Sequence, residues 1–140
     1  MGKRRKARET ALQALFQADF HGSDYQESLR LFWEEQSLDP EVLEFAHQLV
    51  EGVIPRVAEL DNLIEEHSDH WKVNRMSRVD RNILRLAAYE LLELAEIPFK
   101  VTIDEAIEMA KKYGSSESGA FINGILDHIS RDMLNKVRRI

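Results

Sequence analysis

The stretch SRVDRNILRLAAYELLELA, residues 77–95, carries the strongest fold signal of the chain. Ser77 and Asp80 have the three-residue spacing of a capping box, which marks the start of a helix. The apolar residues that follow spread over much of a helical circumference, as in helices at the centre of a bundle. They are Val79, Ile83, Leu84, Leu86, Ala87, Leu91, Leu92 and Leu94. We therefore predict a buried central helix from Ser77 to about Ala95.

Helical spacing also recurs on both sides of this stretch, whereas no segment keeps the period-two alternation of a strand. We therefore predict an all-α fold, a compact bundle of about seven helices in a single domain over residues 1–140. In the first helix, Ala11, Leu12, Leu15, Phe16 and Phe20 form the apolar stripe expected to face the core. This first helix is predicted over about residues 6–20, and a second one over about 25–36. A third starts at Asp39-Pro40, and a short helical piece lies around Trp71. A further helix is opened by a Thr102/Glu105 capping box and ended by Gly114, and the last follows the turn at 115–118.

The helix that starts at Pro40 allows two interpretations. Apolar residues keep the helical phase from Val42 to Ile64, straight through Pro55, which favours one long, bent helix. Proline inside a helix removes a backbone hydrogen bond and costs about 3 kcal/mol. Two helices broken near residues 52–55 are therefore the alternative.

Composition excludes several classes of protein. Of 140 residues, 44% are hydrophobic and 31% are charged, a mixture typical of a globular domain. The chain has no cysteine, which excludes disulfides, thiolate nucleophiles, Cys-based zinc sites and iron–sulfur clusters. No apolar run reaches the roughly 18 residues of a membrane span, and the basic N-terminus leads into Glu9 rather than a signal-peptide core. We expect a cytoplasmic protein with no membrane contact.

Charge is distributed unevenly along the chain. The net charge is −6, yet residues 3–8 carry five of the 19 basic side chains and no acid, so the rest of the chain stands at −11. Residues 24–69 are strongly acidic, and residues 72–85 are basic again. This layout predicts a protein that directs a polyanion to one face. A basic run that leads into an amphipathic helix is a format for nucleic-acid contact, with Phe16, Phe121 and Tyr113 as candidates for base stacking.

No set of residues indicates catalysis or a cofactor. The glycines form no phosphate-binding loop, and the serines at 115–118 have the character of a turn and helix cap. His67, Asp69 and His70 lie close in sequence but lack the spacing of a metal-binding helix pair. We therefore predict no catalytic residues, no metal and no cofactor, and we predict that the protein is not an enzyme.

Three ordered blocks of sequence resemble the NusB family of transcription antitermination factors. The first is KRRKARETALQALF (3–16), the second DRNILRLAAYEL (80–91), and the third IPFKVTIDEAIEMAKKYG (97–114), closed by SGAFINGILD (118–127). The blocks span nearly the whole chain. The resemblance implies two packed helical subdomains, no catalysis, and binding of the boxA element of nascent ribosomal RNA together with the ribosomal protein NusE, in the antitermination complex of RNA polymerase.

The resemblance also implies which residues form the site. RNA contacts fall on Arg4, Arg5, Lys6, Arg8, Phe16, Arg85, Glu117, Ser118 and Phe121, and the surface that faces NusE on Asp80 and Arg81. Phe16 stands where a tyrosine is often found, which retains stacking but loses a hydroxyl group. Glu117 stands where the shorter aspartate is familiar.

Two alternative functions belong to other classes. One is a protein-interaction bundle with only non-specific affinity for RNA, in which the basic N-terminus serves solubility. The other is the RNA-binding part of a methyltransferase, against which the length speaks, since no methyl-donor-binding unit follows. Both a monomer and a homodimer are compatible with the sequence.

Overall fold

The computed structural model describes residues 2–69 and 71–138, and within them every regular element is helical. This confirms the predicted all-α fold. None of the helices in these two ranges is long and apolar enough to cross a membrane. The α-helices are α1 (Gly2–His21), α2 (Tyr25–Glu34), α3 (Pro40–Val53), α4 (Val57–Glu66), α5 (Arg78–Glu93), α6 (Phe99–Tyr113) and α7 (Ser118–Arg138), with 3-10 turns η1 (Gly22–Asp24), η2 (Ile54–Arg56) and η3 (Val73–Arg75).

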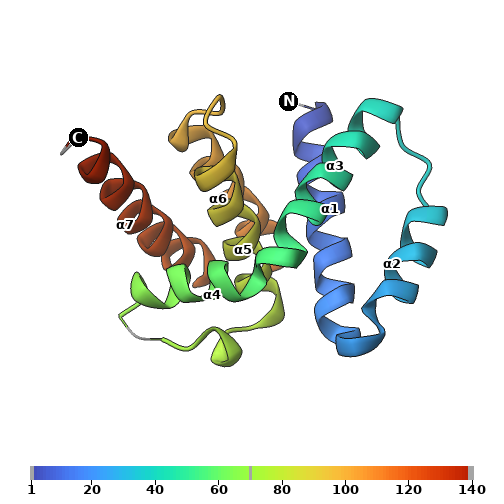
Figure 1. Ribbon diagram of the computed structural model, residues 1–140, viewed down its shortest axis with the longest axis horizontal. Helices are drawn as coiled ribbons and strands as arrows, with labels where there is room; N and C mark the ends of the chain where they lie inside the picture. Colours follow the sequence, from blue (N-terminus) through green and yellow to red (C-terminus); the bar gives the residue numbers. More distant parts are fainter. Residues whose placement is uncertain (1, 70, 139–140) are drawn as a thin grey trace.

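Helix α5 joins the two halves of the molecule. Figure 1 shows α1, α2 and α3 grouped on one side and α4, α6 and α7 on the other, and α5 contacts α1, α3, α4, α6 and α7. Nine of its residues are buried, from Asn82 to Leu91. At its start, the backbone N–H of Asp80 donates to the Ser77 hydroxyl at 3.0 Å, so the predicted cap is present. The prediction of a central buried helix is confirmed.

A buried ion pair ties α1 to α5. The side chains of Arg8 and Glu90 are 4% and 2% exposed. The Arg8 Nε donates to both carboxylate oxygens of Glu90, at 3.1 and 3.0 Å, and its Nη2 donates to Oε1 at 2.8 Å. Thr102 of α6 adds a hydroxyl contact to Glu90 at 3.5 Å. Each of these two buried charges stabilises the other, because a single buried charge without a counter-charge would carry an uncompensated desolvation penalty.

Substitution Glu90→Gln leaves the buried Arg8 guanidinium with only the more distant Glu105, 3.9 Å from its Nη1, so we expect the free energy of unfolding to fall by about 3 kcal/mol. Urea denaturation measures this loss. The matched control is Glu41→Gln, which removes the exposed partner of Lys3 and should cost no more than about 1 kcal/mol. Equal losses in the two variants would contradict the structural role of the buried pair.

The α-helix that starts at Pro40 is interrupted at Pro55, so the favoured prediction of one long, bent helix is wrong. The 3-10 turn η2 separates α3 from α4, and Arg56 leaves the helical region with φ −114° and ψ 16°. Proline has no N–H to continue the α-helical pattern, so the backbone tightens there. Just before the break, a Cβ on Gly52 would lie 2.1 Å from a carbon of the Tyr89 ring, so glycine allows α3 and α5 to approach closely.

Two predicted helix starts differ from the structure. α1 begins at Gly2 rather than near Lys6, so the whole basic run is helical. α6 begins at Phe99 with Pro98 at the N-cap, and the predicted Thr102/Glu105 capping box is wrong. Both of its side chains are used elsewhere, because Thr102 contacts Glu90 and Glu105 accepts from Arg5.

Candidate nucleic-acid interface

The basic run of residues 3–8 forms the first two turns of α1, and its side chains point to three different places. Lys3 pairs with Glu41 of α3 at 2.9 Å, and the Arg4 guanidinium lies 4.0 Å from the centre of the Phe45 ring, also on α3. Arg8 is buried against α5. These cations lie at the positive end of a helix dipole with no acid in the first turn of α1, which makes the site attractive to an anion.

Arg5 and Lys6 lie on the side of α1 away from α3. Arg5 is half-exposed and donates two hydrogen bonds to Glu105 of α6, at 3.0 and 2.7 Å. The hydrogen bond from Arg5 is the main reason why the pKa of Glu105 lies below its ordinary value. Lys6 is exposed, and no ion pair involves it in the part of the chain that the structure describes. Lys6 is therefore the cation of this run most available to a phosphate group.

A row of exposed side chains continues from Lys6 along α1. We call it the α1 stripe; its members recur at helical spacing, and they are Lys6, Gln13, Phe16, Gln17 and Phe20. Phe16 is 37% exposed and Phe20 61% exposed, so neither ring on the apolar stripe is enclosed in the core. The buried apolar side of α1 consists of alanines and leucines instead: Ala7, Ala11, Leu12, Ala14 and Leu15. Exposed phenyl rings in line with a lysine suit a single-stranded nucleic acid, whose bases stack on such rings.

The far end of the α1 stripe meets the start of α5. The Arg78 guanidinium lies 5.2 Å from the centre of the Phe20 ring. Neither Phe20 nor Arg78 was predicted as a site residue from the sequence. Arg78 belongs to the basic segment 72–85, which the sequence does show. For Phe20, the helical spacing of α1 does not tell whether another helix covers the ring.

The turn into α7 brings together Glu117, Ser118 and Phe121. Glu117 is exposed and Phe121 is half-buried, whereas Ser118 is only 2% exposed. The Ser118 hydroxyl accepts a hydrogen bond from the Ser115 backbone N–H at 2.9 Å, and it lies 2.5 Å from the position that a Cβ on Gly114 would take. Ser118 therefore stabilises the conformation of the turn, whereas Glu117 and Phe121 are the residues available for contact with a ligand.

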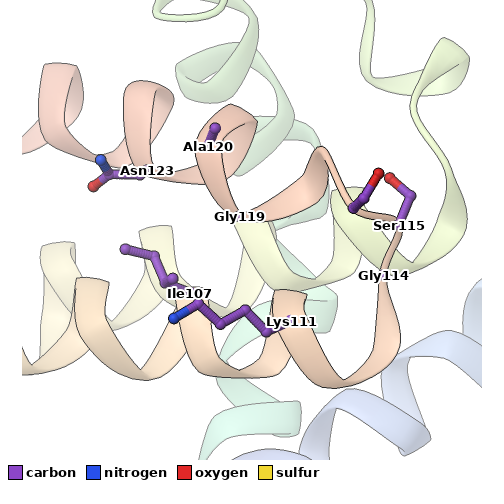
Figure 2. A pocket seen from close by; sticks show the side chains of 8 residues that line it. Ile107, Lys111, Gly114, Ser115, Gly119, Ala120 and Asn123 are labelled. Carbon is purple, nitrogen blue, oxygen red and sulfur yellow. The ribbon is translucent and has the colours of Figure 1, made fainter.

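A hollow of about 460 Å³ opens beside this turn, between the second half of α6 and the first half of α7 (Figure 2). Small residues at Gly114, Gly119 and Ala120 leave the space, and Lys111 and Asn123 supply polar groups at its margin. Helical spacing could not predict this hollow, because it forms only where two helices converge. Its volume and polar margin are suited to a nucleotide.

Trp71 is a second aromatic residue that the sequence analysis did not assign to the site. Its side chain is 55% exposed, and its ring centre lies 6.4 Å from that of Phe121 in an edge-to-face arrangement. Lys72 and Arg75 line the same shallow hollow as Trp71. The Ser68 hydroxyl holds the loop through the carbonyl oxygen of Trp71 at 3.0 Å. The two cations that closely follow Trp71 in the sequence, Lys72 and Arg75, were the signal that could have identified it.

Arg85 and Arg81 belong to a polar network around Asp19 of α1. The Arg81 guanidinium donates to Asp19 at 2.7 and 2.9 Å, and Arg85 donates to Asp61 at 2.7 and 2.9 Å and to Asp19 at 3.3 Å. Arg85 is 8% exposed. Nearby, one carboxylate oxygen of Asp80 is buried without a hydrogen-bond partner among the described residues. The network fixes the end of α1 against α5.

The Asp19 network predicts a pH-dependent stability. Burial pushes the pKa of Asp19 upward, but the hydrogen bonds from Arg81 and Asn82 outweigh it and hold this pKa below its ordinary value. A lowered pKa in the folded state stabilises the fold above the unfolded-state pKa of about 4, and this stabilisation disappears as the pH falls. We expect Asp19→Asn to cost about 1–3 kcal/mol at pH 7.

Urea denaturation of both proteins across a pH series measures this effect. The difference in unfolding free energy between the wild-type protein and the Asp19→Asn variant should shrink as the pH falls below about 4. A difference that stays constant down to pH 2.5 would show that the charge of Asp19 does not stabilise the fold.

Comparisons with known proteins cover nearly the whole chain. Residues 5–131 match the model of the NusB family. The transcription antitermination protein NusB of Desulfatibacillum aliphaticivorans is 50% identical over 129 residues, 92% of this chain and 90% of that protein. The solved structure of T. maritima NusB has a TM-score of 0.83 and 42% identity, covering 92% of this chain and 91% of that one. A chain in the crystal structure of antitermination factors NusB and NusE in complex with dsRNA has a TM-score of 0.84 and 30% identity, covering 94% and 98%.

Proposed function

This chain belongs to the NusB family, and from that premise we propose that it is a transcription antitermination factor. It binds the boxA element of nascent ribosomal RNA together with the ribosomal protein NusE and so promotes antitermination by RNA polymerase. The relatives are named as antitermination proteins, and the protein acts by binding, not as an enzyme. A factor that acts on RNA as it is transcribed works in the cytoplasm.

The observation that carries this proposal is the α1 stripe, which begins at the basic end of α1 and exposes Phe16 along its course. Single-stranded RNA binds through phosphate neutralisation and base stacking, and the stripe offers both. Lys6 and Arg4 contact phosphates, and Arg5 exchanges Glu105 for a phosphate. Phe16 stacks on a base.

The turn into α7 supplies the second contact region, through Glu117 and Phe121. Three other residues implied by the family resemblance lie too deep for extended contact, because Arg8, Arg85 and Ser118 are 4%, 8% and 2% exposed. Their hydrogen bonds hold α1, α5 and the α7 turn in place. We therefore assign them to positioning the RNA-binding residues.

The start of α5 is the surface that we assign to NusE. Asp80 and Arg81 lie there, and Arg81 is held by Asp19. This surface adjoins Phe20 and Arg78 at the far end of the α1 stripe.

The experiment that tests the function is a titration of a labelled boxA single strand with this protein, alone and with NusE, against a scrambled RNA. We expect tighter binding to boxA than to the scramble, a further gain with NusE, and weaker binding at higher salt. Equal, salt-sensitive binding to both RNAs would instead indicate an interaction bundle with only non-specific affinity for RNA.

Lys6→Ala removes the cation most available to a phosphate. We expect weaker binding to both RNAs and a salt slope, log Kd against log salt, that is smaller by about one unit. The matched control is Lys100→Ala, since Lys100 is 84% exposed and lies on α6 beside Asp104. A salt slope that is unchanged in the Lys6 variant would remove Lys6 from the interface.

Phe16→Leu keeps an apolar side chain but removes the ring on which a base stacks. We expect a loss of about 1–3 kcal/mol in boxA binding. The Phe16→Tyr control retains the ring and should bind at least as well as the wild-type protein. If Leu and Tyr behave alike in competition binding, Phe16 makes no stacking contact.

A further inference from the structure

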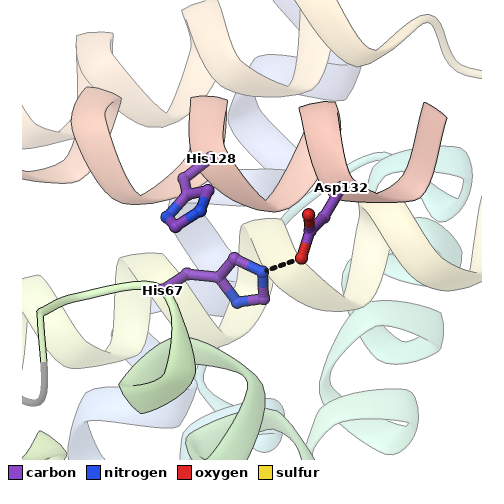
Figure 3. Close-up of side chains that lie close together, drawn as sticks. All are labelled: His67, His128 and Asp132. Atoms are coloured by element: carbon purple, nitrogen blue, oxygen red, sulfur yellow. Dashed lines mark hydrogen bonds and ion pairs between the residues drawn. The ribbon is translucent and has the colours of Figure 1, made fainter. Parts of the chain in front are cut away.

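Three potential metal ligands converge where the end of α4 meets α7. His67 directly follows α4, and His128 and Asp132 lie one helical turn apart on α7 (Figure 3). One ligand atom from each residue lies within 4.8 Å of the other two. The sequence had grouped His67 with Asp69 and His70; His70 lies outside the described residues, and the structure brings His67 to two residues more than 60 positions later instead.

The two ring nitrogens of His67 point at two different oxygen atoms. The His67 side chain is 7% exposed, its Nδ1 lies 2.8 Å from the Leu63 carbonyl oxygen, and its Nε2 lies 2.8 Å from Asp132 Oδ2. Both of these partners are acceptors, whereas a neutral imidazole carries only one N–H. A divalent ion bound at Nε2 would leave the Nδ1–H free to donate to the Leu63 carbonyl oxygen, so both ring nitrogens would have a partner.

His128 is the third potential ligand. Its ring centre lies 4.6 Å from that of His67, in an edge-to-face arrangement. A divalent ion bound to His67 and Asp132 would take this nearby imidazole as a further ligand. His128 is exposed, so rotation of its side chain can bring its nitrogen closer to the other two ligand atoms, as a zinc ion with bonds of about 2.0–2.1 Å requires.

We propose that His67, His128 and Asp132 bind a divalent transition-metal ion, Zn²⁺ by the chemistry of the donor set. Two imidazole nitrogens and one carboxylate oxygen are ligands that zinc accepts in tetrahedral sites, with water at the fourth position. With the ion on Nε2, the Nδ1–H of His67 donates to the Leu63 carbonyl, the supporting hydrogen bond that metal-bound histidines usually make.

The charges around the cluster are compatible with this role. The Asp132 carboxylate is ionised at neutral pH, as is ordinary for aspartate, and can supply one anionic oxygen ligand. Lys136 lies one turn further along α7. The adjacent Arg131 is paired with Asp127 at 2.7 Å and is thereby held away from the ligands. The bound ion would tie the end of α4 to the middle of α7.

The test is a Zn²⁺ titration of the untagged, full-length protein by calorimetry at pH 7, with Co²⁺ absorption as a report of tetrahedral nitrogen and oxygen ligation. We expect binding of one ion per chain and a rise in Tm with Zn²⁺. His128→Asn and Asp132→Asn, both on an accessible helix surface, should each weaken binding at least about tenfold and abolish the rise in Tm.

The matched control is His47→Asn. His47 and Glu51 form the same one-turn pair on α3, with 3.7 Å between Nδ1 and Oε1, but no third ligand joins them among the described residues. This variant should bind Zn²⁺ like the wild-type protein. Absence of saturable binding, an equal loss in His47→Asn, or a loss in His70→Asn without one in His128→Asn would each overturn the proposal.

Discussion

The buried pair of Arg8 and Glu90 is the interaction on which the rest of the structure depends. A charged pair enclosed between α1 and α5 tolerates little displacement, because each charge has exchanged its hydration for the other. The pair therefore sets the rotation of α1 about its own axis. That rotation directs Lys6 and Phe16 outward and Asp19 toward the arginines of α5.

The start of α1 gathers cations where a helix dipole disfavours them. Acids from three other helices offset this cost, since Glu41 comes from α3, Glu90 from α5 and Glu105 from α6. Of these, Glu90 is buried, whereas the pairs formed by Glu41 and Glu105 are partly or fully open to water. An arriving phosphate competes with the open pairs and leaves the buried one intact, so the same basic run serves both stability and binding.

Predictions from the sequence were correct where the interaction joins neighbouring residues, and wrong where it joins different helices. The start of α5 was predicted correctly because Ser77 caps a backbone N–H only three residues away. The start of α6 was predicted wrongly because Thr102 and Glu105, which have the spacing of a cap, contact other helices. Phe20 was placed on the apolar stripe of α1 from its spacing, although its side chain is 61% exposed.

By itself, the sequence determined the helical class, the buried character of α5, the basic start of α1 and the family, because periodicity, composition and motifs are properties of neighbouring residues. Only the tertiary structure decided which cations are buried and which aromatic rings are exposed. It also placed His67 beside His128, and left a hollow between α6 and α7. These features arise where helices far apart in the chain meet, and helical spacing carries no information about which helix lies opposite.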